Sequence, residues 1–412
     1  MGQIVHFGLG NFARAHVLDY TADAGGGWQV TGVNLRSSAT RDGLAAQDFK
    51  YALNVQGSGI KQISVIKTVL LASESQQAVL EAMANANIIS ATVTEKGYHL
   101  DQNGQLDVHD PVIASELNGP ALRSLIGFIA HDLTRRDRPV TILSCDNRVG
   151  NGDALRQAVQ HFAQAAQLHI DWSLARFPNA MVDRITPATT DKIRHESNDP
   201  MAVPTEAFRE WVIEDNFAGP RPDWPDVQFV QDVRPHELRK LRMLNGAHSF
   251  LAYAGLAQGY DYVHEAISDP QLRRQALTLM MEAGATLPQE VYDQVPAYAQ
   301  ALLVRFDNSE LAHRLDQIAM DGSQKLPYRI LETLRARCTR FDFSRARMDV
   351  LLHRPNHSGQ KAEGSSGRGY RKICQLRSAR THVVAADWCG RFSATHFGII
   401  APRYCTTCAA SA

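Results

Sequence analysis

Short apolar segments rich in β-branched residues alternate with longer amphipathic stretches over the first half of the chain. The strand-like segments cover residues 3–7, 28–35, 60–71, 88–94 and 140–147, and helical patterns lie between them at residues 73–86 and 119–135. Strands that are apolar on both faces are typical of a parallel sheet with helices on each side. The pattern therefore predicts an α/β fold.

The first strand-like segment leads into a glycine-rich turn and then a helical pattern. The sequence Gly8-Leu-Gly10-Asn-Phe-Ala13 fits G-x-G-x-x-A, in which the first glycine permits the turn and the second lets a pyrophosphate approach the backbone. Such a match is common by chance, but its position at the first strand favours a nucleotide site. We therefore predict a Rossmann-type dinucleotide-binding domain over residues 1–190.

Residues at the strand ends are the candidate cofactor ligands, because ligands of open α/β sheets bind beyond the carboxyl ends of the strands. The acid that usually binds the ribose hydroxyls is missing after the second strand, where Asn34 and Arg36 stand instead. Arg36 can accept the 2′-phosphate of NADP or simply face solvent, so we expect NAD and keep NADP as the alternative. The candidate cofactor-binding residues are Phe7, Gly8, Gly10, Asn11, Phe12, Arg36, Thr94 and Lys96.

A second group of polar residues lies on a predicted helix that crosses Gly246. At about 100° per residue, Lys240, Asn245 and His248 share one face with Glu237. An amine, an amide and an imidazole on one face suit acid–base catalysis, although the solvated face of a surface helix would show the same pattern. We place this helix in a mostly α-helical substrate domain over residues 191–337, which we expect to be incomplete.

Eight motifs in a constant order resemble one family from residue 4 to about residue 335. They are GLGNFARAH, TVTEKGY, SCDN, MVDRITPA, EWVIEDNF, KLRMLNGAHSF, RFDN and IAMDGSQKLP. In these motifs the chain resembles the polyol-specific long-chain dehydrogenases and reductases, the mannitol dehydrogenase family. The wording of EWVIEDNFAGPRPDW, LNGAHSFLAY and AMDGSQKLP most resembles the fructuronate reductase (mannonate oxidoreductase) branch.

The resemblance implies a metal-independent oxidoreductase in which Lys240 is the general acid/base. Asn245 and Asn147 would hold the developing alkoxide, and His248 would orient the substrate. A lysine in this role needs a pKa lowered towards neutrality, which an apolar helix face can supply. No HExxH motif or clustered His and Cys spacing occurs over residues 1–334, so we expect no metal.

Further residues are expected to support the pocket and to recognise the substrate. Glu237 is a candidate gate for protons or water near the lysine, and Asp183 a candidate support of the pocket wall. A hexuronate carries a carboxylate, which needs a further cation; Arg184, Lys325 and Arg329 are the candidates, and each can instead be a surface charge. We expect NADH-dependent, reversible reduction of fructuronate to mannonate. The alternatives are mannitol 2-dehydrogenase, another polyol or uronate dehydrogenase of the family, or an inactive nucleotide-binding product.

Composition changes sharply near the end of the chain. The 412 residues carry no formal net charge, yet residues 335–412 contain about ten more bases than acids and five of the six cysteines. A Gly/Ser/Lys-rich stretch covers residues 359–369, and no family motif follows residue 335. We therefore predict an atypical tail over residues 338–412, unstructured or read from a shifted frame. Cys405 and Cys408 would be half a zinc site, with no second pair at a suitable spacing.

Neither a membrane nor a nucleic acid is an expected partner. No apolar run reaches about 18 residues and the N-terminus lacks a basic region before its short apolar segment, so we expect a cytoplasmic protein. The basic tail lacks the regular aromatic residues typical of nucleic-acid binding. We expect a small polyol or sugar acid as substrate, and a monomer or weak oligomer.

Overall fold

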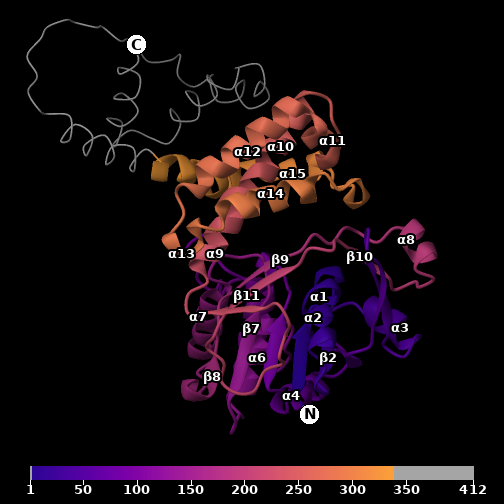
Figure 1. Cartoon of the computed structure of the whole chain (residues 1–412). Helices are drawn as coiled ribbons and strands as arrows, with labels where there is room; N and C mark the ends of the chain where they lie inside the picture. Colours follow the sequence, from indigo (N-terminus) through magenta and orange to yellow (C-terminus); the bar gives the residue numbers. More distant parts are fainter. Residues whose placement is uncertain (1, 338–412) are drawn as a thin grey trace, which may run out of the picture. The chain divides into compact units, whose positions relative to one another are not determined.

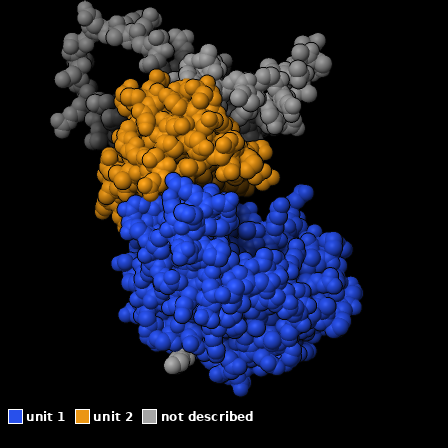
Figure 2. All heavy atoms as spheres, turned by 90° about the vertical axis from the view of Figure 1, so that its right-hand side faces the viewer, with its two compact units in different colours: residues 1–237 blue, residues 238–412 orange. Residues whose placement is uncertain are grey.

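A computed structural model describes residues 2–337 of the chain (Figure 1). The chain divides into two units, unit 1 over Met1–Glu237 and unit 2 from Leu238 onward, which Figure 2 shows in blue and orange. The tail predicted over residues 338–412, with Cys405 and Cys408, lies outside the described residues.

A six-stranded parallel sheet forms the centre of unit 1. Its strands are, in spatial order, β5 (Ile66–Leu71), β2 (Gln29–Asn34), β1 (Gln3–Phe7), β6 (Ile88–Ala91), β7 (Val140–Ser144) and β8 (Ala175–Arg176). The first strand lies in the middle and the chain crosses to both sides of it, as in doubly wound dinucleotide-binding domains. This order confirms the predicted Rossmann-type α/β fold.

Successive residues of the central strands point to opposite faces of this sheet, and each face carries its own hydrophobic core. Ile4 and Ile88 belong to one core, and their neighbours Val5 and Ile89 belong to the other. The helices of one core are α4 (Gln76–Ala84), α5 (Pro111–Leu117), α6 (Leu125–Leu133) and α7 (Asn151–Ala165); the other core takes α2 (Val17–Ala24), β9 (Ala180–Asp183) and β11 (Glu210–Glu214). Burial on both faces explains why these strands read as continuous apolar runs.

Two small sheets correct two expectations. The single strand expected over residues 60–71 is two strands, because β4 (Gly59–Ile63) pairs antiparallel with β3 (Tyr51–Val55) while β5 joins the main sheet. The expected domain boundary at residue 190 also differs from the observed one, since β10 (Val203–Thr205) pairs with β3, and β11 pairs with β9 and β12 (Gln228–Val230). These pairings hold residues 191–237 in unit 1.

Short helices complete unit 1. They are α1 (Asn11–Ala15), α3 (Ala39–Ala45), η1 (Glu95–Tyr98), η2 (Trp172–Leu174) and α8 (Asp191–Glu196).

Unit 2 is helical, as predicted for the substrate domain. The chain enters it through α9 (Arg234–Arg239), a π-helical turn η3 (Lys240–Leu244) and α10 (Asn245–Ala257). The remaining elements are α11 (Val263–Ser268), α12 (Pro270–Gly284), α13 (Gln289–Tyr292), α14 (Val295–Phe306), η4 (Ser309–Leu311), α15 (Leu315–Ala319), α16 (Gly322–Leu326) and η5 (Pro327–Leu331). Helix α10 packs against α11, α12 and α15 and carries much of the core. Over residues 2–337, no helix is both long and apolar enough to cross a membrane.

Candidate functional site

A cavity of about 500 Å³ opens in unit 1 at the carboxyl ends of β1, β2 and β6. Of the predicted cofactor residues, Gly8, Gly10, Arg36, Thr94 and Lys96 line it. The lining also includes residues that the sequence did not single out, among them Ser37, Thr40, Thr92 and Arg123. The cavity lies where a doubly wound sheet binds its dinucleotide.

The other predicted cofactor residues do not line the cavity. Phe7 is fully buried in the core of the sheet, in contact with Phe128. The Asn11 amide donates to the Thr189 hydroxyl (3.1 Å), and the Phe12 ring stacks on His16. These three side chains hold the turn and its helix in place, so their expected contact with the cofactor is not supported.

The two glycines of the turn have different roles. Gly8 has a φ of +87°, and a Cβ there would lie 2.2 Å from the Thr92 carbonyl oxygen, so a side chain is excluded. At Gly10 a Cβ would meet nothing within 4 Å. Gly8 therefore allows β1 and β6 to approach each other, whereas Gly10 leaves backbone accessible at the cavity wall. This geometry fits the pyrophosphate of a dinucleotide.

A buried hydrogen-bond chain joins β1 to β6 beneath the cavity. His6 Nδ1 lies 2.8 Å from the Ser90 hydroxyl and Nε2 lies 3.0 Å from the Thr92 hydroxyl, which itself donates to the Gly8 carbonyl (2.7 Å). Because Thr92 uses its only proton on Gly8, Nε2 of His6 must carry a proton and Nδ1 must accept from Ser90. Burial lowers the pKa of His6 to about 3, so the ring is neutral. In the sequence, the only sign of this hydrogen-bond network is a lone histidine in an apolar strand.

Asp146, directly after β7, holds the loop that carries Thr94 and Lys96. Its carboxylate accepts hydrogen bonds from the backbone N–H groups of Thr94 (2.8 Å) and Val93 (3.3 Å) and from the Tyr98 hydroxyl (3.2 Å). Thr94 has a φ of +65°, which is unfavourable for a β-branched residue. Burial raises the pKa of Asp146, against the lowering effect of the backbone hydrogen bonds. Asp146 thus fixes one wall of the cavity.

Asn147 follows Asp146 in the loop after β7, and Glu237 holds this loop. Asn147 is exposed, while Glu237 is buried and accepts a hydrogen bond from the Gly150 N–H (2.9 Å). Asp183 is buried at the end of β9. The structure therefore places Glu237 with the Asn147 loop, which the sequence did not predict.

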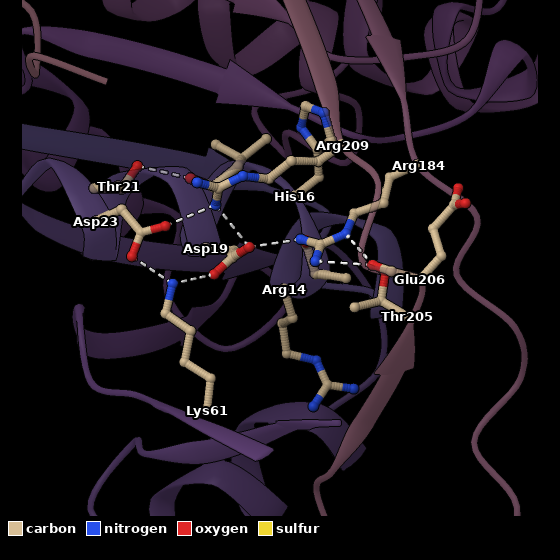
Figure 3. Close-up of polar contacts among 12 residues, drawn as sticks. Arg14, His16, Asp19, Thr21, Asp23, Lys61, Arg184, Thr205, Glu206 and Arg209 are labelled. Atoms are coloured by element: carbon tan, nitrogen blue, oxygen red, sulfur yellow. Dashed lines mark hydrogen bonds and ion pairs between the residues drawn. The ribbon is translucent and has the colours of Figure 1, made fainter. Parts of the chain in front are cut away.

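Arg184 has a structural role, contrary to the expectation that it binds a substrate carboxylate (Figure 3). Its Nη1 donates to Asp19 (2.6 Å) and to the Ala15 carbonyl, and Nε and Nη2 donate to the Glu206 carbonyl (3.1 Å each). Only 2% of its side chain is exposed. All three nitrogens of this guanidinium thus donate within unit 1, and its burial keeps it from acting as a ligand-binding group.

We call the ionic group around Asp19 the Asp19 cluster: Asp19, Lys61, Arg184 and Arg209 (Figure 3). Burial alone would raise the pKa of Asp19, but the hydrogen bond from Lys61 and the charge of Arg184 lower it below its usual value. The carboxylate is therefore ionised, and its neighbours neutralise it.

The predicted catalytic helix of unit 2 has a wider turn than expected. Over Lys240–Leu244 it is π-helical, and the Asn245 N–H donates to the Lys240 carbonyl. Hydrogen bonds of a π turn span five residues, so Lys240 and Asn245 lie one turn apart and the uniform step of 100° does not hold. Apolar periodicity does not reveal such a turn, and turns of this kind are frequent at functional sites.

His248 is buried on α10 one turn after Asn245. Its Nε2 has no hydrogen-bond partner among the described residues. Burial first, and then the neighbouring His313, Arg305, Arg329 and Lys240, lower the pKa of His248 well below its usual value. The imidazole is therefore neutral, and the charged groups that influence it most are basic.

Of the remaining candidate cations, Arg329 lies close to α10, whereas Lys325 forms its hydrogen bond within its own segment. Arg329 donates from Nη1 to the Ser249 hydroxyl (3.1 Å), and a Cβ at Gly246 would lie 3.2 Å from the Arg329 carbonyl oxygen. Lys325 donates to the Met320 carbonyl of its own segment (2.6 Å). Arg305 belongs to the RFDN motif, but its position beside His248 was not predicted.

Over residues 2–337, no group of three or more His, Cys, Asp or Glu side chains is arranged to hold a metal ion.

Two family models match the chain. The mannitol dehydrogenase Rossmann domain matches residues 2–226, and the mannitol dehydrogenase C-terminal domain matches residues 232–350. D-mannonate oxidoreductase of Escherichia coli is 41% identical over 364 residues, which are 81% of this chain and 75% of that protein. Mannitol 2-dehydrogenase of Pyrenophora tritici-repentis is 38% identical, over 80% of this chain and 64% of that protein.

Solved structures give the same result. The ternary complex of Pseudomonas fluorescens mannitol 2-dehydrogenase with NAD and D-mannitol has a TM-score of 0.74 and 33% identity, and covers 97% of this chain and 88% of its own. A substrate-free D-sorbitol dehydrogenase has a TM-score of 0.76 and 31% identity, over 82% of this chain and 76% of its own. The chain therefore belongs to the mannitol dehydrogenase family and is an oxidoreductase of the nicotinamide-dependent secondary-alcohol dehydrogenase class.

Proposed function

We propose that this enzyme interconverts fructuronate and mannonate, with NADH as the reductant of the ketone. The observation that carries the proposal is the basic side chains near the buried His248: Arg329 donates to the hydroxyl of Ser249, the next residue of α10 (3.1 Å), and the charges of Arg305 and Lys240 also act on the ring. A hexuronate brings a carboxylate that such side chains bind well, whereas a polyol brings only hydroxyl groups. The likeness to D-mannonate oxidoreductase supports the same choice.

The cavity of unit 1 is the proposed cofactor site. Its backbone is accessible at Gly10, and Arg36, Thr94 and Lys96 line it. The bound nicotinamide would supply the hydride. The loop of Thr94 and Lys96 would keep its shape through Asp146, so that the cofactor meets a preorganised wall.

Lys240 is the proposed proton donor to the carbonyl oxygen. The buried side chain begins the π turn, and Asn245 follows one turn later, so that an ammonium and an amide come from one side of the helix. Reduction of a ketone leaves negative charge on oxygen, which the Asn245 and Asn147 amides would stabilise by hydrogen bonds. Losing one such donor typically costs about 3 kcal/mol of barrier.

His248 is the proposed orienting residue. A neutral ring can donate from one nitrogen and accept at the other, so its unpartnered Nε2 can hydrogen-bond a substrate hydroxyl. Glu237 would act on protons or water near Lys240 and would also hold the Asn147 loop through Gly150. Asp183 would support the pocket as a buried carboxylate.

Mannitol 2-dehydrogenase activity is the second candidate, because the similar ternary complex contains D-mannitol. An inactive nucleotide-binding product is the third, and it depends on the tail beyond residue 337. Lys240, Asn147, Asn245 and His248 are all present, which favours retained chemistry.

A spectrophotometric panel tests the proposal. Fructuronate, tagaturonate and fructose are offered with NADH, and mannonate and mannitol with NAD, to the purified full chain. We expect turnover of fructuronate and mannonate. Turnover of fructose and mannitol without that of fructuronate would establish the second candidate, and no turnover with intact NADH binding would establish the third.

A further inference from the structure

We propose that His313 is a further substrate-binding residue of unit 2, and that it shares one substrate hydroxyl with His248. The inference rests on the proposed function only in taking His248 as a residue that contacts the substrate. His313 precedes α15 and lies in none of the eight sequence motifs. The group that it would bind is a hydroxyl, which hexonates and polyols have in common.

The imidazole rings of His248 and His313 lie next to each other, edge to face. Their centroids are 5.3 Å apart, and their planes are nearly perpendicular, at 80°. Two hydrogen bonds to one oxygen, each about 2.9 Å long, together span a similar distance. One hydroxyl group can therefore bridge the two rings.

Each ring has a buried nitrogen that lacks a hydrogen-bond partner in the part of the chain that the structure describes. These atoms are Nε2 of His248 and Nδ1 of His313. The surroundings are apolar: the Phe306 ring lies 4.8 Å from that of His248, and Leu311 and Leu315, on either side of His313 in the chain, are buried. Leaving a buried polar atom unpaired is costly, so a ligand group that pairs with both nitrogens recovers this cost.

The backbone fixes the position of His313. Its carbonyl accepts a hydrogen bond from the Val263 N–H (3.0 Å), and the Leu315 N–H donates to the Asp261 carbonyl (2.9 Å). The two bonds belong to an antiparallel bridge at the start of α11. The ring therefore needs no ligand to hold it beside His248, and a preorganised pair of this kind binds at a lower entropic cost.

A hydroxyl group suits two neutral imidazoles better than a carboxylate does. Burial lowers the pKa of His313, as it does for His248, so both rings are neutral at neutral pH. A hydroxyl can donate to the unprotonated nitrogen of one ring and accept from the N–H of the other, whereas a carboxylate can only accept. The charged side chains that act on His248, Arg305 and Arg329 among them, are better partners for a carboxylate. The histidine pair and the arginines would thus recognise different parts of one substrate.

Binding of mannitol and of mannonate to the full chain with NADH present, measured by calorimetry, tests the inference. No turnover occurs, because the reduced cofactor cannot take up a hydride. His313→Phe keeps an aromatic ring beside His248 and removes the nitrogens, so each ligand that binds the unchanged chain should bind about fivefold to tenfold more weakly. His313→Asn brings an amide close to the position of Nδ1 and should restore the affinity to within about threefold.

Nitrogen NMR of the isotopically labelled chain distinguishes contact with the ligand from a purely structural role. The imidazole signals of His313 are assigned by their absence from His313→Phe. They should shift when the ligand is added to the NADH-bound protein, because a new hydrogen bond changes the shielding of Nδ1.

The matched control is His264→Phe. His264 is also half-buried, and its Nδ1 likewise has no partner within residues 2–337, but its ring stacks on Tyr262 (5.5 Å between centroids). The same substitution there should leave both affinities unchanged.

Unchanged affinity in His313→Phe, no recovery in His313→Asn, stationary His313 signals, an equal loss in His264→Phe, or no binding of either ligand to the unchanged chain would each overturn the inference. Binding of mannitol without mannonate would contradict the proposed preference for a carboxylate. It would leave the comparison of the variants intact, so the two proposals fail separately.

Discussion

The two units treat buried ionisable groups in opposite ways. In unit 1, the buried Asp19 forms ion pairs with Lys61, Arg184 and Arg209, which balance its charge. In unit 2, the buried His248 is neutral, and the charged groups that influence it most are basic. The first arrangement is complete without a ligand. The second places a neutral ring near basic groups, and our proposal brings the substrate carboxylate to this region.

A second contrast concerns the two neutral histidines. In unit 1, His6 is bonded at both ring nitrogens, to Ser90 and to Thr92. In unit 2, Nε2 of His248 lacks a partner among the described residues. A buried polar atom without a partner costs about 1–3 kcal/mol, and our proposal gives this nitrogen a substrate hydroxyl as its partner.

The largest expected effect lies in unit 2. Lys240→Ala should lower kcat by about 10³-fold or more, because it removes the proposed proton donor. NADH affinity, measured by fluorescence titration, should stay within about twofold, since the cofactor cavity belongs to unit 1. Lys192→Ala, at an exposed lysine of α8, is the control and should behave as the unchanged chain does. Near-normal turnover in Lys240→Ala would remove the lysine from its role.

The next effect concerns stability in unit 1. Asp19→Asn should lower the free energy of unfolding by about 3–5 kcal/mol, because it leaves the buried Arg184 without its counter-ion. Urea unfolding at neutral pH measures it. Asp23→Asn removes a carboxylate that pairs with the same Lys61 and Arg209 but is 30% exposed, so about 1 kcal/mol or less is expected. Equal losses in the two variants would contradict the distinction between a buried cluster and its rim.

A pH dependence should result from His6. The folded ring has a pKa of about 3, below the ordinary value of 6.5, so below pH 6.5 the unfolded chain binds a proton that the folded chain does not. The free energy of unfolding should therefore fall as pH drops from 6.5 towards 3. His6 should account for about 3 kcal/mol of this loss at pH 4. Urea unfolding from pH 7 to pH 4 should show a shallower slope in His6→Gln. Parallel slopes would mean that the ring is not neutral in the fold.

The fold is largely predictable from the sequence because its signals are local. Apolar runs and the turn at Gly8 and Gly10 predict the parallel sheet, and the motifs predict the two-part organisation. The strand pairings that keep residues 191–237 in unit 1 are long-range contacts between short segments, which no local pattern predicts. The domain boundary expected at residue 190 therefore differs from the end of unit 1 at Glu237.

The candidate site is less predictable because the role of each residue depends on its hydrogen-bond and ion-pair partners. Arg184 and Arg329 look equivalent in the sequence, yet Arg184 is paired with Asp19, whereas Arg329 donates to Ser249 of α10. The π turn after Lys240 likewise changes the helix face without any sign in the apolar spacing. Asp146 was visible only as a polar residue after a strand, and its hold on Thr94 emerges only when the two loops meet.

One measurement tests the central claim, that basic side chains near His248 select a substrate with a carboxylate. It is the ratio of kcat/KM for fructuronate to kcat/KM for fructose, in the unchanged chain and in Arg329→Leu. Ser249→Ala is the control, because it removes the partner of Arg329 and keeps the guanidinium.

We predict that the unchanged chain prefers fructuronate and that Arg329→Leu lowers the ratio about tenfold to a hundredfold, as the loss of a charge-assisted contact would. Fructose turnover and the ratio in Ser249→Ala should change little. A preference for fructose, or the same ratio in Arg329→Leu as in the unchanged chain, would contradict the account.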